Sequence, residues 1–535
     1  MLLSLLLIIY GLILSFCLGK YSWTILQKCF GFTDSIALHQ AIFPIIGMAA
    51  MSPVIGCYHF FFKIDFVLHV FFLGVVFLTY KNTWIKAGLS EVRVNWIVYT
   101  ILIIGAVFSI MIRPGTGDIA DYHLQAIKWA ENYPNIIGLG NFNRPLANNN
   151  WWFNLQAFFG FSCLGVNSVY VGNALFFIAV FAWLYLSETT SKAHAWLRFI
   201  FASFVILSLK TAFIGAVTSD FIVTLMIYLL LDLSVISLNR KENSNQYLLL
   251  TVLFICWIVT VKTTAIVFFM LPLLGLIQLF IKKQYFFLTR CVILGLVFII
   301  PWLIGNVIIC GYLLYPFNQL DFFAVDWKVP ASFFEYDKIV LNSWAKVPNQ
   351  DVYVTKMMPI NDWLPMWFAR LDILNKLLAI GFVISAPLSW IFLWKKKDII
   401  WPVLFIQLGF MLIFLNGPHP RFLFGYMVSS IAFLAYLIAD YMPVKLPKKV
   451  LLYLGVLLLL FLTYSNRIDQ NLAANWFKPK PYPKVNLEPT NINGFEAMIA
   501  KENGVCWDQF PSSYYFIEMV ELRGTTVESG FRVKQ

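Results

Sequence analysis

Residues 116–130, TGDIADYHLQAIKWA, place two carboxylates, a histidine and a lysine between long apolar segments. The glycines on either side of Thr116 favour a turn, and the residue spacing that follows predicts a helix that begins near Asp118. Two carboxylates on one helix face at a membrane surface can bind a cation or accept a proton from a hydroxyl group. Asp118 and Asp121 are therefore the candidate catalytic residues. In the simpler alternative, Asp118 caps the helix and Asp121 complements the helix dipole.

A helical wheel divides this segment into two faces. The polar stripe holds Asp118, Asp121, Gln125, Lys128 and Asn132, and the opposite stripe holds Ile119, Tyr122, Ala126, Trp129, Ala130 and Tyr133. Such a helix is expected to lie in the membrane interface with its aromatic face in the headgroup region. His123 falls at the edge of the apolar face, away from the two aspartates.

A few other charges interrupt apolar sequence. Lys262 lies within about forty otherwise apolar residues, Lys210 precedes TAFIGAVTSD, in which Asp220 begins the next apolar run, and Arg421 opens another run. Ionisable groups at membrane depth are costly and usually face a cavity or a partner. Cations that neutralise a phosphate, next to a carboxylate that activates a hydroxyl group, would suit an anionic substrate. The alternatives are a simple turn at Lys262, a helix start at Asp220 and a snorkelling side chain at Arg421.

The composition shows which class of protein must position these residues. The chain of 535 residues is 60% hydrophobic and 12% charged, whereas a soluble domain has roughly 25% charged residues. It is therefore predicted to be an all-α polytopic membrane protein with about fourteen transmembrane helices. The spans are expected near residues 2–18, 34–56, 64–80, 94–112, 166–186, 195–209, 214–236, 247–261, 264–281, 288–312, 376–394, 399–416, 419–439 and 449–465.

The short loops between these spans differ in charge. Eighteen Lys and Arg residues, with Lys192 and Arg198 among them, fall in one set of loops, and only Lys63, Lys210, Lys262 and Arg421 fall in the other. Because positive charge marks the cytoplasmic side, both termini, the 113–165 and 313–375 loops and the tail from residue 466 are expected outside.

Several functions are excluded. The net charge of +12 reflects membrane orientation and does not indicate nucleic-acid binding. No GxxxxGK[ST] loop or GxGxxG turn indicates nucleotide chemistry, and no predicted cytoplasmic loop is long enough for a nucleotide-binding domain. The eight scattered cysteines form no CxxC pair, so neither a zinc site nor a disulfide framework is indicated.

An apolar span, an Asp-led amphipathic helix and a short polar link follow one another in this chain. This order resembles the GT-C membrane glycosyltransferases, which take sugars from polyprenyl-phosphate carriers on the outer face of a membrane. The resemblance rests on the Asp-led helix GDIADYHLQAIKW and the Pro-containing link NFNRPLANNNWWF. The second acid, Asp121, stands three residues after Asp118, where many members have an adjacent Glu. The chain resembles more closely a bacterial family of predicted multi-spanning glycosyltransferases from surface-polysaccharide loci, through VKTTA, PWLIGNVIICGYLLYPF, DWKVP, HPRF, CWD and RGTTVESGFR.

The resemblance implies a GT-C-like enzyme of the bacterial plasma membrane, with its active site on the periplasmic face. A polyprenyl-phosphate-linked sugar would be the donor, and a glycan or lipid hydroxyl would be the acceptor. Asp118 would be the base, Lys262, Arg421 and Lys210 would bind the donor phosphate, and a divalent Mg or Mn ion on Asp118 and Asp121 is an option that the reaction does not require. The predicted substrate-binding residues are His123, Asn149, Asp220, Asp326, Trp327 and Lys328.

The predicted organisation follows the spans. It comprises N-terminal helices (1–93), a GT-C-like core (94–312), an aromatic-rich external loop (313–375), C-terminal helices (376–465) and a small external tail module (466–535). A lipid-linked oligosaccharide flippase would also have twelve to fourteen spans, but charges and helix breaks would be expected at mid-membrane. A polysaccharide polymerase would be expected to cluster arginines in its large loop, and Arg113, Arg144 and Arg370 are far apart in the sequence.

Overall fold

The protein is mostly helical. The computed structural model describes residues 1–32, 38–79, 96–111, 117–165, 169–208, 213–239, 244–317, 319–394, 396–442, 477, 479–500, 505–513 and 519–534. The helices follow the apolar runs because a backbone in lipid must satisfy its hydrogen bonds within its own segment.

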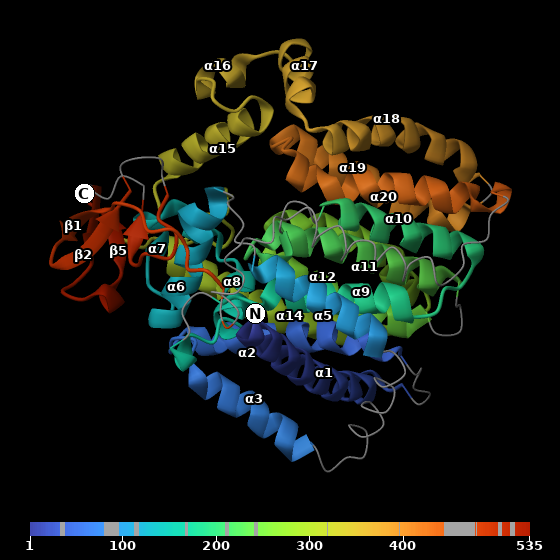
Figure 1. Cartoon of the computed structure of the whole chain (residues 1–535), viewed down its shortest axis with the longest axis horizontal. Helices are drawn as coiled ribbons and strands as arrows, with labels where there is room; N and C mark the ends of the chain where they lie inside the picture. Colours follow the sequence, from blue (N-terminus) through green and yellow to red (C-terminus); the bar gives the residue numbers. More distant parts are fainter. Residues whose placement is uncertain are drawn as a thin grey trace.

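Long helices form a bundle that fills most of Figure 1. They are α1 (Leu2–Phe30), α2 (Phe43–His59), α3 (Phe66–Thr79), α5 (Trp96–Met111), α9 (Gly172–Leu186), α10 (Lys192–Ser208), α11 (Ser219–Asn239), α12 (Ser244–Val261), α13 (Met270–Ile281), α14 (Tyr285–Cys310), α18 (Ile373–Leu393), α19 (Ile400–Asn416) and α20 (Pro420–Ile438). Helices α11 and α12 are buried along most of their length, whereas α13 and α14 expose most of their apolar surface. Exposed apolar side chains on peripheral helices are what a surrounding lipid phase requires.

The bundle confirms the prediction of a polytopic helical membrane protein. Nine helices within the described residues are long and apolar enough to cross a membrane, and α3, α5 and α9 are shorter apolar helices. Each predicted span up to 419–439 coincides with one of the helices of the bundle. The predicted span 449–465 lies outside the described residues.

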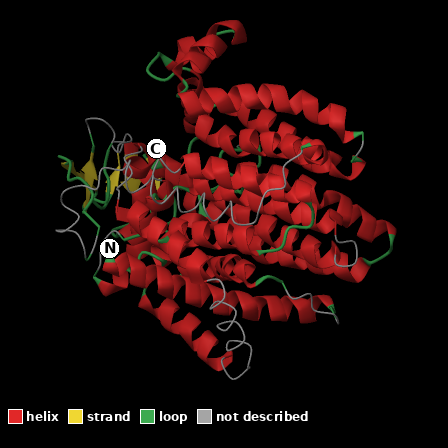
Figure 2. Ribbon diagram, turned by 45° about the vertical axis from the view of Figure 1, so that its right-hand side comes forward, coloured by secondary structure: helices red, strands yellow, loops and turns green. Residues whose placement is uncertain are grey.

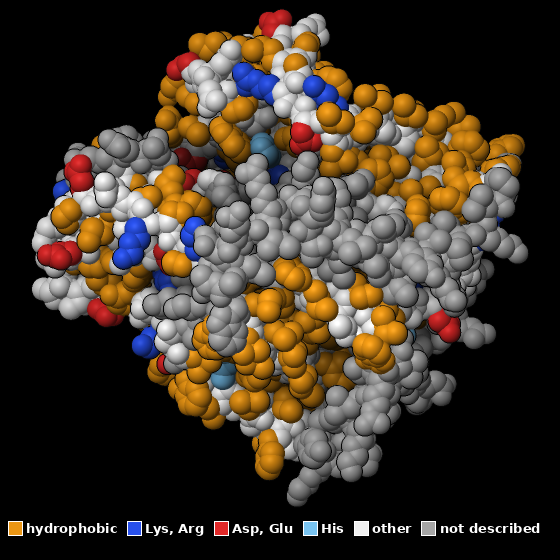
Figure 3. Space-filling model, viewed as in Figure 1, with side chains coloured by type: hydrophobic (Ala, Val, Ile, Leu, Met, Phe, Trp, Pro, Cys, Tyr) orange, Lys and Arg blue, Asp and Glu red, His pale blue; other side chains and the backbone are white. Residues whose placement is uncertain are grey.

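The two predicted external loops fold into short helices at one end of the bundle. The first loop contains a π-helical turn, Ile119–His123, followed by α6 (Leu124–Asn132), α7 (Leu139–Phe142) and α8 (Trp151–Phe158). The second contains α15 (Ala331–Lys346), α16 (Val352–Met357) and α17 (Ile360–Arg370). On the face seen in Figure 3, charged side chains gather over the strands and α15–α17, and hydrophobic side chains cover α18.

The tail forms a small β module beside the first loop. Strands β1 (Glu488–Ile492), β2 (Phe495–Ile499) and β3 (Ser512–Ser513) make one sheet, in which β1 and β2 are antiparallel and β2 and β3 are parallel. Strands β4 (Val520–Leu522) and β5 (Phe531–Val533) form an antiparallel pair. Figure 2 shows the strands and both termini on the same side of the helices. The amino group of Met1 donates to the carbonyl of Phe477, 3.2 Å away, which ties the N-terminus to the tail.

The module and the first loop share a hydrophobic core. Trp129 and Phe142 of the loop pack with Val520, Leu522 and Phe531 of the module. The backbones come very close at two glycines with positive φ, because a Cβ at Gly138 would lie 2.0 Å from the carbonyl oxygen of Phe531 and one at Gly530 would lie 2.3 Å from that of Ile137. The tail module is thus built onto the first loop, an arrangement that the sequence did not indicate.

Candidate functional site

Four charged residues from distant parts of the chain meet at the end of the bundle that carries the loops. Arg421 forms an ion pair with Asp118, and its Nε lies 2.9 Å from Oδ2 of Asp220. Lys262 forms an ion pair with the other carboxylate oxygen of Asp220. We call Asp118, Asp220, Lys262 and Arg421 the four-charge cluster; all four were predicted site residues. The charges alternate in sign, so the cluster is neutral while its cations are largely shielded from solvent.

Helix ends bring these residues together. Asp220 lies in the first turn of α11, and Lys262 follows the last residue of α12, positions at which a carboxylate and an ammonium group each complement the helix dipole. Arg421 is the second residue of α20, where the dipole disfavours a cation, and its side chain is only 18% exposed. The two carboxylates at Arg421 compensate for this position, so the snorkelling alternative does not describe it.

Asp121 differs from Asp118 although both lie on the same turn. Asp121 is half-buried, and no described residue forms a hydrogen bond or ion pair with its carboxyl group. Burial, together with the negative charge of Asp118, raises the pKa of Asp121 to about 7. A carboxyl group that titrates near neutrality can accept a proton from a substrate at physiological pH.

His123 is close enough to the cluster to interact electrostatically with Asp118 and Asp220. It is buried, its ring packs 5.0 Å from that of Phe153, and Nδ1 has no hydrogen-bond partner among the described residues. Burial lowers the pKa of His123 to about 4, so the imidazole is neutral at pH 7. The helical wheel placed His123 away from the aspartates because it assumed an α-helix, whereas residues 119–123 form a wider π-helical turn.

The predicted contact of the Asp-led helix's aromatic face with lipid headgroups is wrong, because Ile119, Trp129 and Ala130 of that face are buried inside the protein. Gln125, Lys128 and Glu131 of α6 are buried, and Lys128 pairs with Glu131 at 2.9 Å. Gln125 lies under the tail module, which contributes all three of its hydrogen-bond partners, so this part of the polar stripe faces protein. The sequence pattern showed the two faces of the helix but not what would cover them.

The other predicted residues have different surroundings. Asn149 and Trp302 hydrogen-bond to each other's backbone carbonyls at 3.0 Å. Asp326 accepts hydrogen bonds from Arg523 of the module, whose guanidinium lies 4.7 Å from the centre of the Trp327 ring. Lys328 pairs with Asp321. No contact within the described residues joins Asn149 or residues 326–328 to the four-charge cluster, and Lys210 lies outside those residues.

A metal ion does not fit the two predicted ligands well. Asp118 is held by Arg421, and within the described part of the chain no group of three His, Cys, Asp or Glu residues is arranged to hold a cation.

His419 and Trp367, which were not predicted as site residues, connect the four-charge cluster to the second loop. His419 caps α20 by accepting a hydrogen bond from the backbone N–H of Arg421. Its ring stacks on Trp344 of α15, with centres 4.7 Å apart and planes 10° apart. The Trp367 indole of α17 donates to the carbonyl of Pro418 at 2.6 Å. Residues 418 and 419 thus anchor α17 and α15, and His419 also positions Arg421.

The comparisons with known proteins identify a family. A family described as "Domain of unknown function (DUF8201)" matches residues 1–428. The chain belongs to this family. The match includes all four residues of the four-charge cluster and ends before the tail module. No curated protein and no solved structure matches the chain.

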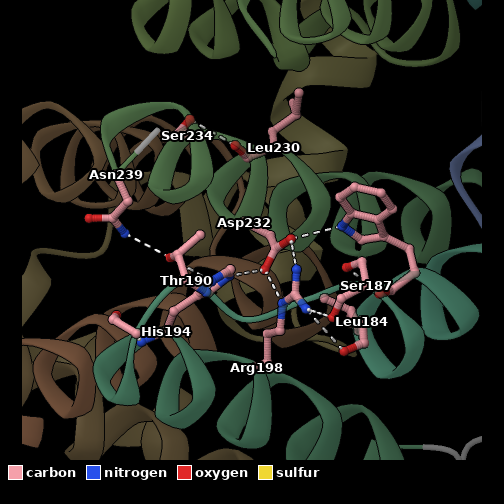
Figure 4. A network of polar contacts seen from close by, with 11 residues as sticks. Leu184, Ser187, Thr190, His194, Arg198, Leu230, Asp232, Ser234 and Asn239 are labelled. Atoms are coloured by element: carbon pink, nitrogen blue, oxygen red, sulfur yellow. Dashed lines mark hydrogen bonds and ion pairs between the residues drawn. The ribbon is translucent and has the colours of Figure 1, made fainter. Parts of the chain in front are cut away.

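A second charged cluster lies among α9, α10 and α11 and is shown in Figure 4. Arg198 donates to both carboxylate oxygens of Asp232, at 2.6 and 2.8 Å, and all three charged or titratable members, Arg198, Asp232 and His194, are completely buried. The His194 ring and the indole of Trp183 also form hydrogen bonds with the Asp232 carboxylate. Counting Arg198 as a loop charge was therefore wrong. An aspartate inside an apolar run, with His194 and Arg198 four residues apart on one helix face, was the signal that could have revealed this cluster.

Proposed function

We propose that this protein is a GT-C-like membrane glycosyltransferase that transfers a sugar from a polyprenyl-phosphate-linked donor to an acceptor hydroxyl group. The observation that carries the proposal is the presence, at one end of a helical bundle, of a neutral, partly buried four-charge cluster and of the Asp121 carboxyl group, which has no hydrogen-bond or ion-pair partner among the described residues. This combination supplies a phosphate-binding element and a base in the same place.

Lys262 and Arg421 are suited to the phosphate of the donor. Both cations are partly shielded from solvent and are balanced by Asp118 and Asp220, so neither is left as an uncompensated buried charge before substrate binds. Phosphate oxygens can take the place of the carboxylate oxygens at the ammonium and guanidinium groups. Ammonium and guanidinium groups held in position in this way stabilise the negative charge that develops on the leaving phosphate.

Asp121 is better suited than Asp118 to act as the base. Asp118 is engaged in an ion pair with Arg421, whereas no described residue forms an ion pair with Asp121, and the pKa of Asp121 is raised to about 7. In the proposed step, the acceptor oxygen bonds to the anomeric carbon while its proton passes to Asp121. The bond between that carbon and the phosphate oxygen breaks, and its electron pair leaves with the polyprenyl phosphate.

The proposed location is the bacterial plasma membrane, with the site and both termini on the periplasmic side. Two features support this orientation. The predicted external loops, the tail and Met1 share one end of the bundle, and most basic loop residues fall in the other set of loops. The lipid tail of the donor would reach the site from the outer leaflet, and the full set of fourteen spans belongs to this proposal.

The test uses purified protein in lipid vesicles with radiolabelled polyprenyl-phosphate sugars and a crude polysaccharide acceptor. We expect transfer by the wild type and by Asp398→Asn, a control at the opposite end of the bundle. Asp121→Asn should bind the sugar donor normally, but its transfer rate should fall roughly 10²- to 10⁴-fold, which is the usual contribution of a general base. Movement of the lipid-linked sugar across the vesicle membrane without transfer would contradict the proposal and support a flippase.

A further inference from the structure

The tail module forms hydrogen bonds to the turn that carries Asp121. The carbonyl of Ala120, the residue before Asp121, accepts hydrogen bonds from the backbone N–H groups of Cys506 and Trp507, at 3.0 and 2.8 Å. Two successive amides from a segment almost 400 residues away thus hold the backbone immediately next to the carboxyl-bearing residue.

A second anchor lies one turn further along the same helix. Gln125 is completely buried, and its amide nitrogen donates to the carbonyls of Trp507 and Gln509 at 3.0 and 2.8 Å. Its amide oxygen accepts from the backbone N–H of Ser512 at 3.1 Å. A buried amide whose three hydrogen bonds all go to the backbone of one other segment fixes the relative position of the two segments closely.

These anchors flank Asp121 on both sides, and other contacts between the module and the two loops lie elsewhere. Ser513 Oγ donates to the carbonyl of Phe142, and Arg523 binds Asp326, both away from the π-helical turn. Burial is the main reason for the raised pKa of Asp121.

We propose that residues 506–512 of the tail module belong to the catalytic site, and that they position Asp121 through the hydrogen bonds that they make with Ala120 and Gln125. Gln125 is a positioning residue, because it acts on the reaction through Asp121. The inference rests on the proposed function where it names Asp121 as the base, but the anchoring of the turn can be measured separately.

The experiment compares Gln125→Met with Ser513→Ala in the full-length protein. Gln125→Met keeps the side-chain size and loses the three hydrogen bonds to the module, whereas Ser513→Ala removes the hydrogen bond to the carbonyl of Phe142, at a distance from the turn. For Gln125→Met we expect kcat to fall roughly 10- to 100-fold with an unchanged KM for the donor, because misplacing a catalytic group affects the chemical step. Ser513→Ala should keep kcat close to that of the wild type.

Hydrogen exchange of the backbone amides of residues 119–126 gives a readout that needs no activity. Exchange should become at least about tenfold faster in Gln125→Met and stay unchanged in Ser513→Ala. Unchanged exchange in Gln125→Met, or equal effects of both substitutions on kcat, would overturn the proposal. If Gln125→Met does not fold, Gln125→Glu, which keeps the acceptor and loses both donors, replaces it. If the wild type transfers no sugar, the proposed function fails, and the exchange result still decides whether the module anchors this turn.

Discussion

Asp118 and Asp121 show how two similar side chains on one turn can acquire different chemistry. Arg421 forms an ion pair with Asp118, whereas no described residue does so with the half-buried Asp121, whose pKa is raised to about 7. When the environments of two neighbouring carboxyl groups differ in this way, their roles in acid–base catalysis are expected to differ too. The resemblance to GT-C enzymes favoured Asp118 as the base, and the sequence could not show that Asp118 pairs with a residue 303 positions away.

This difference predicts the pH dependence of the reaction. A base works in its deprotonated form, so kcat/KM should rise with pH, with a midpoint near 7, and then level off. Asp118→Asn removes a negative neighbour and releases Arg421, and both changes lower the pKa of Asp121. Cys506, which interacts electrostatically with Asp121, is a neutral thiol in this range because burial raises its pKa. The acid limb of the Asp118→Asn profile should therefore move to lower pH; a limb that stays in place or moves upward would exclude Asp121 as the base.

At the scale of the elements, the sequence predicted well what depends on local hydrophobicity and poorly what depends on distant contacts. Asp220, Lys262 and Arg421 were found because each lies where an apolar run begins or ends, and helix ends on one side of a membrane must come near each other. The π-helical turn at residues 119–123 and the burial of Gln125 could not be predicted in this way. Both are associated with the tail module, which lies almost 400 residues away.

The close approach of Gly138 to the module can be tested against a matched glycine. Gly138 and Gly165 both have φ of 65°, so Ala at either position carries backbone strain of about 1–2 kcal/mol. Only at Gly138 would the new Cβ also collide with a carbonyl oxygen, that of Phe531, since nothing lies within 4 Å at Gly165. Limited proteolysis should therefore cut residues 479–534 faster in Gly138→Ala than in Gly165→Ala. Equal cleavage rates would show that the contact does not hold the module.

The buried cluster around Asp232 should act as a structural clamp among α9, α10 and α11. Asp232→Asn leaves the buried guanidinium of Arg198 without its counter-charge, which costs about 3–5 kcal/mol of unfolding free energy. The exposed pair of Asp440 and Lys396 is the comparison, and Asp440→Asn should cost about 0–1 kcal/mol. Unfolding titrations of the two variants in detergent measure this difference. Similar small losses would mean that the buried pair contributes little net stability.

At the scale of the whole molecule, polarity is arranged along the axis of the bundle. The four-charge cluster, the helices of both loops and the tail module share one end, whereas Lys192 contacts the carbonyl of Met442 and Lys396 pairs with Asp440 at the other. Because successive spans cross the membrane in opposite directions, the sequence could predict which loops lie at the same end of the bundle. The side of the membrane on which each end of the bundle lies is inferred from the charge of the loops alone.

Because loop charge orients membrane proteins, the end that carries the cluster should face outward. Two exposed positions report on the two ends: Met357 in α16, which is 81% exposed, and Lys282, which follows α13. In a chain whose eight native cysteines are replaced, a membrane-impermeant maleimide added to intact spheroplasts should label Met357→Cys. Lys282→Cys should react only after the membrane is permeabilised. The reverse pattern would place the cluster in the cytoplasm, where a donor in the outer leaflet could not reach it, and would refute the orientation on which the proposed reaction depends.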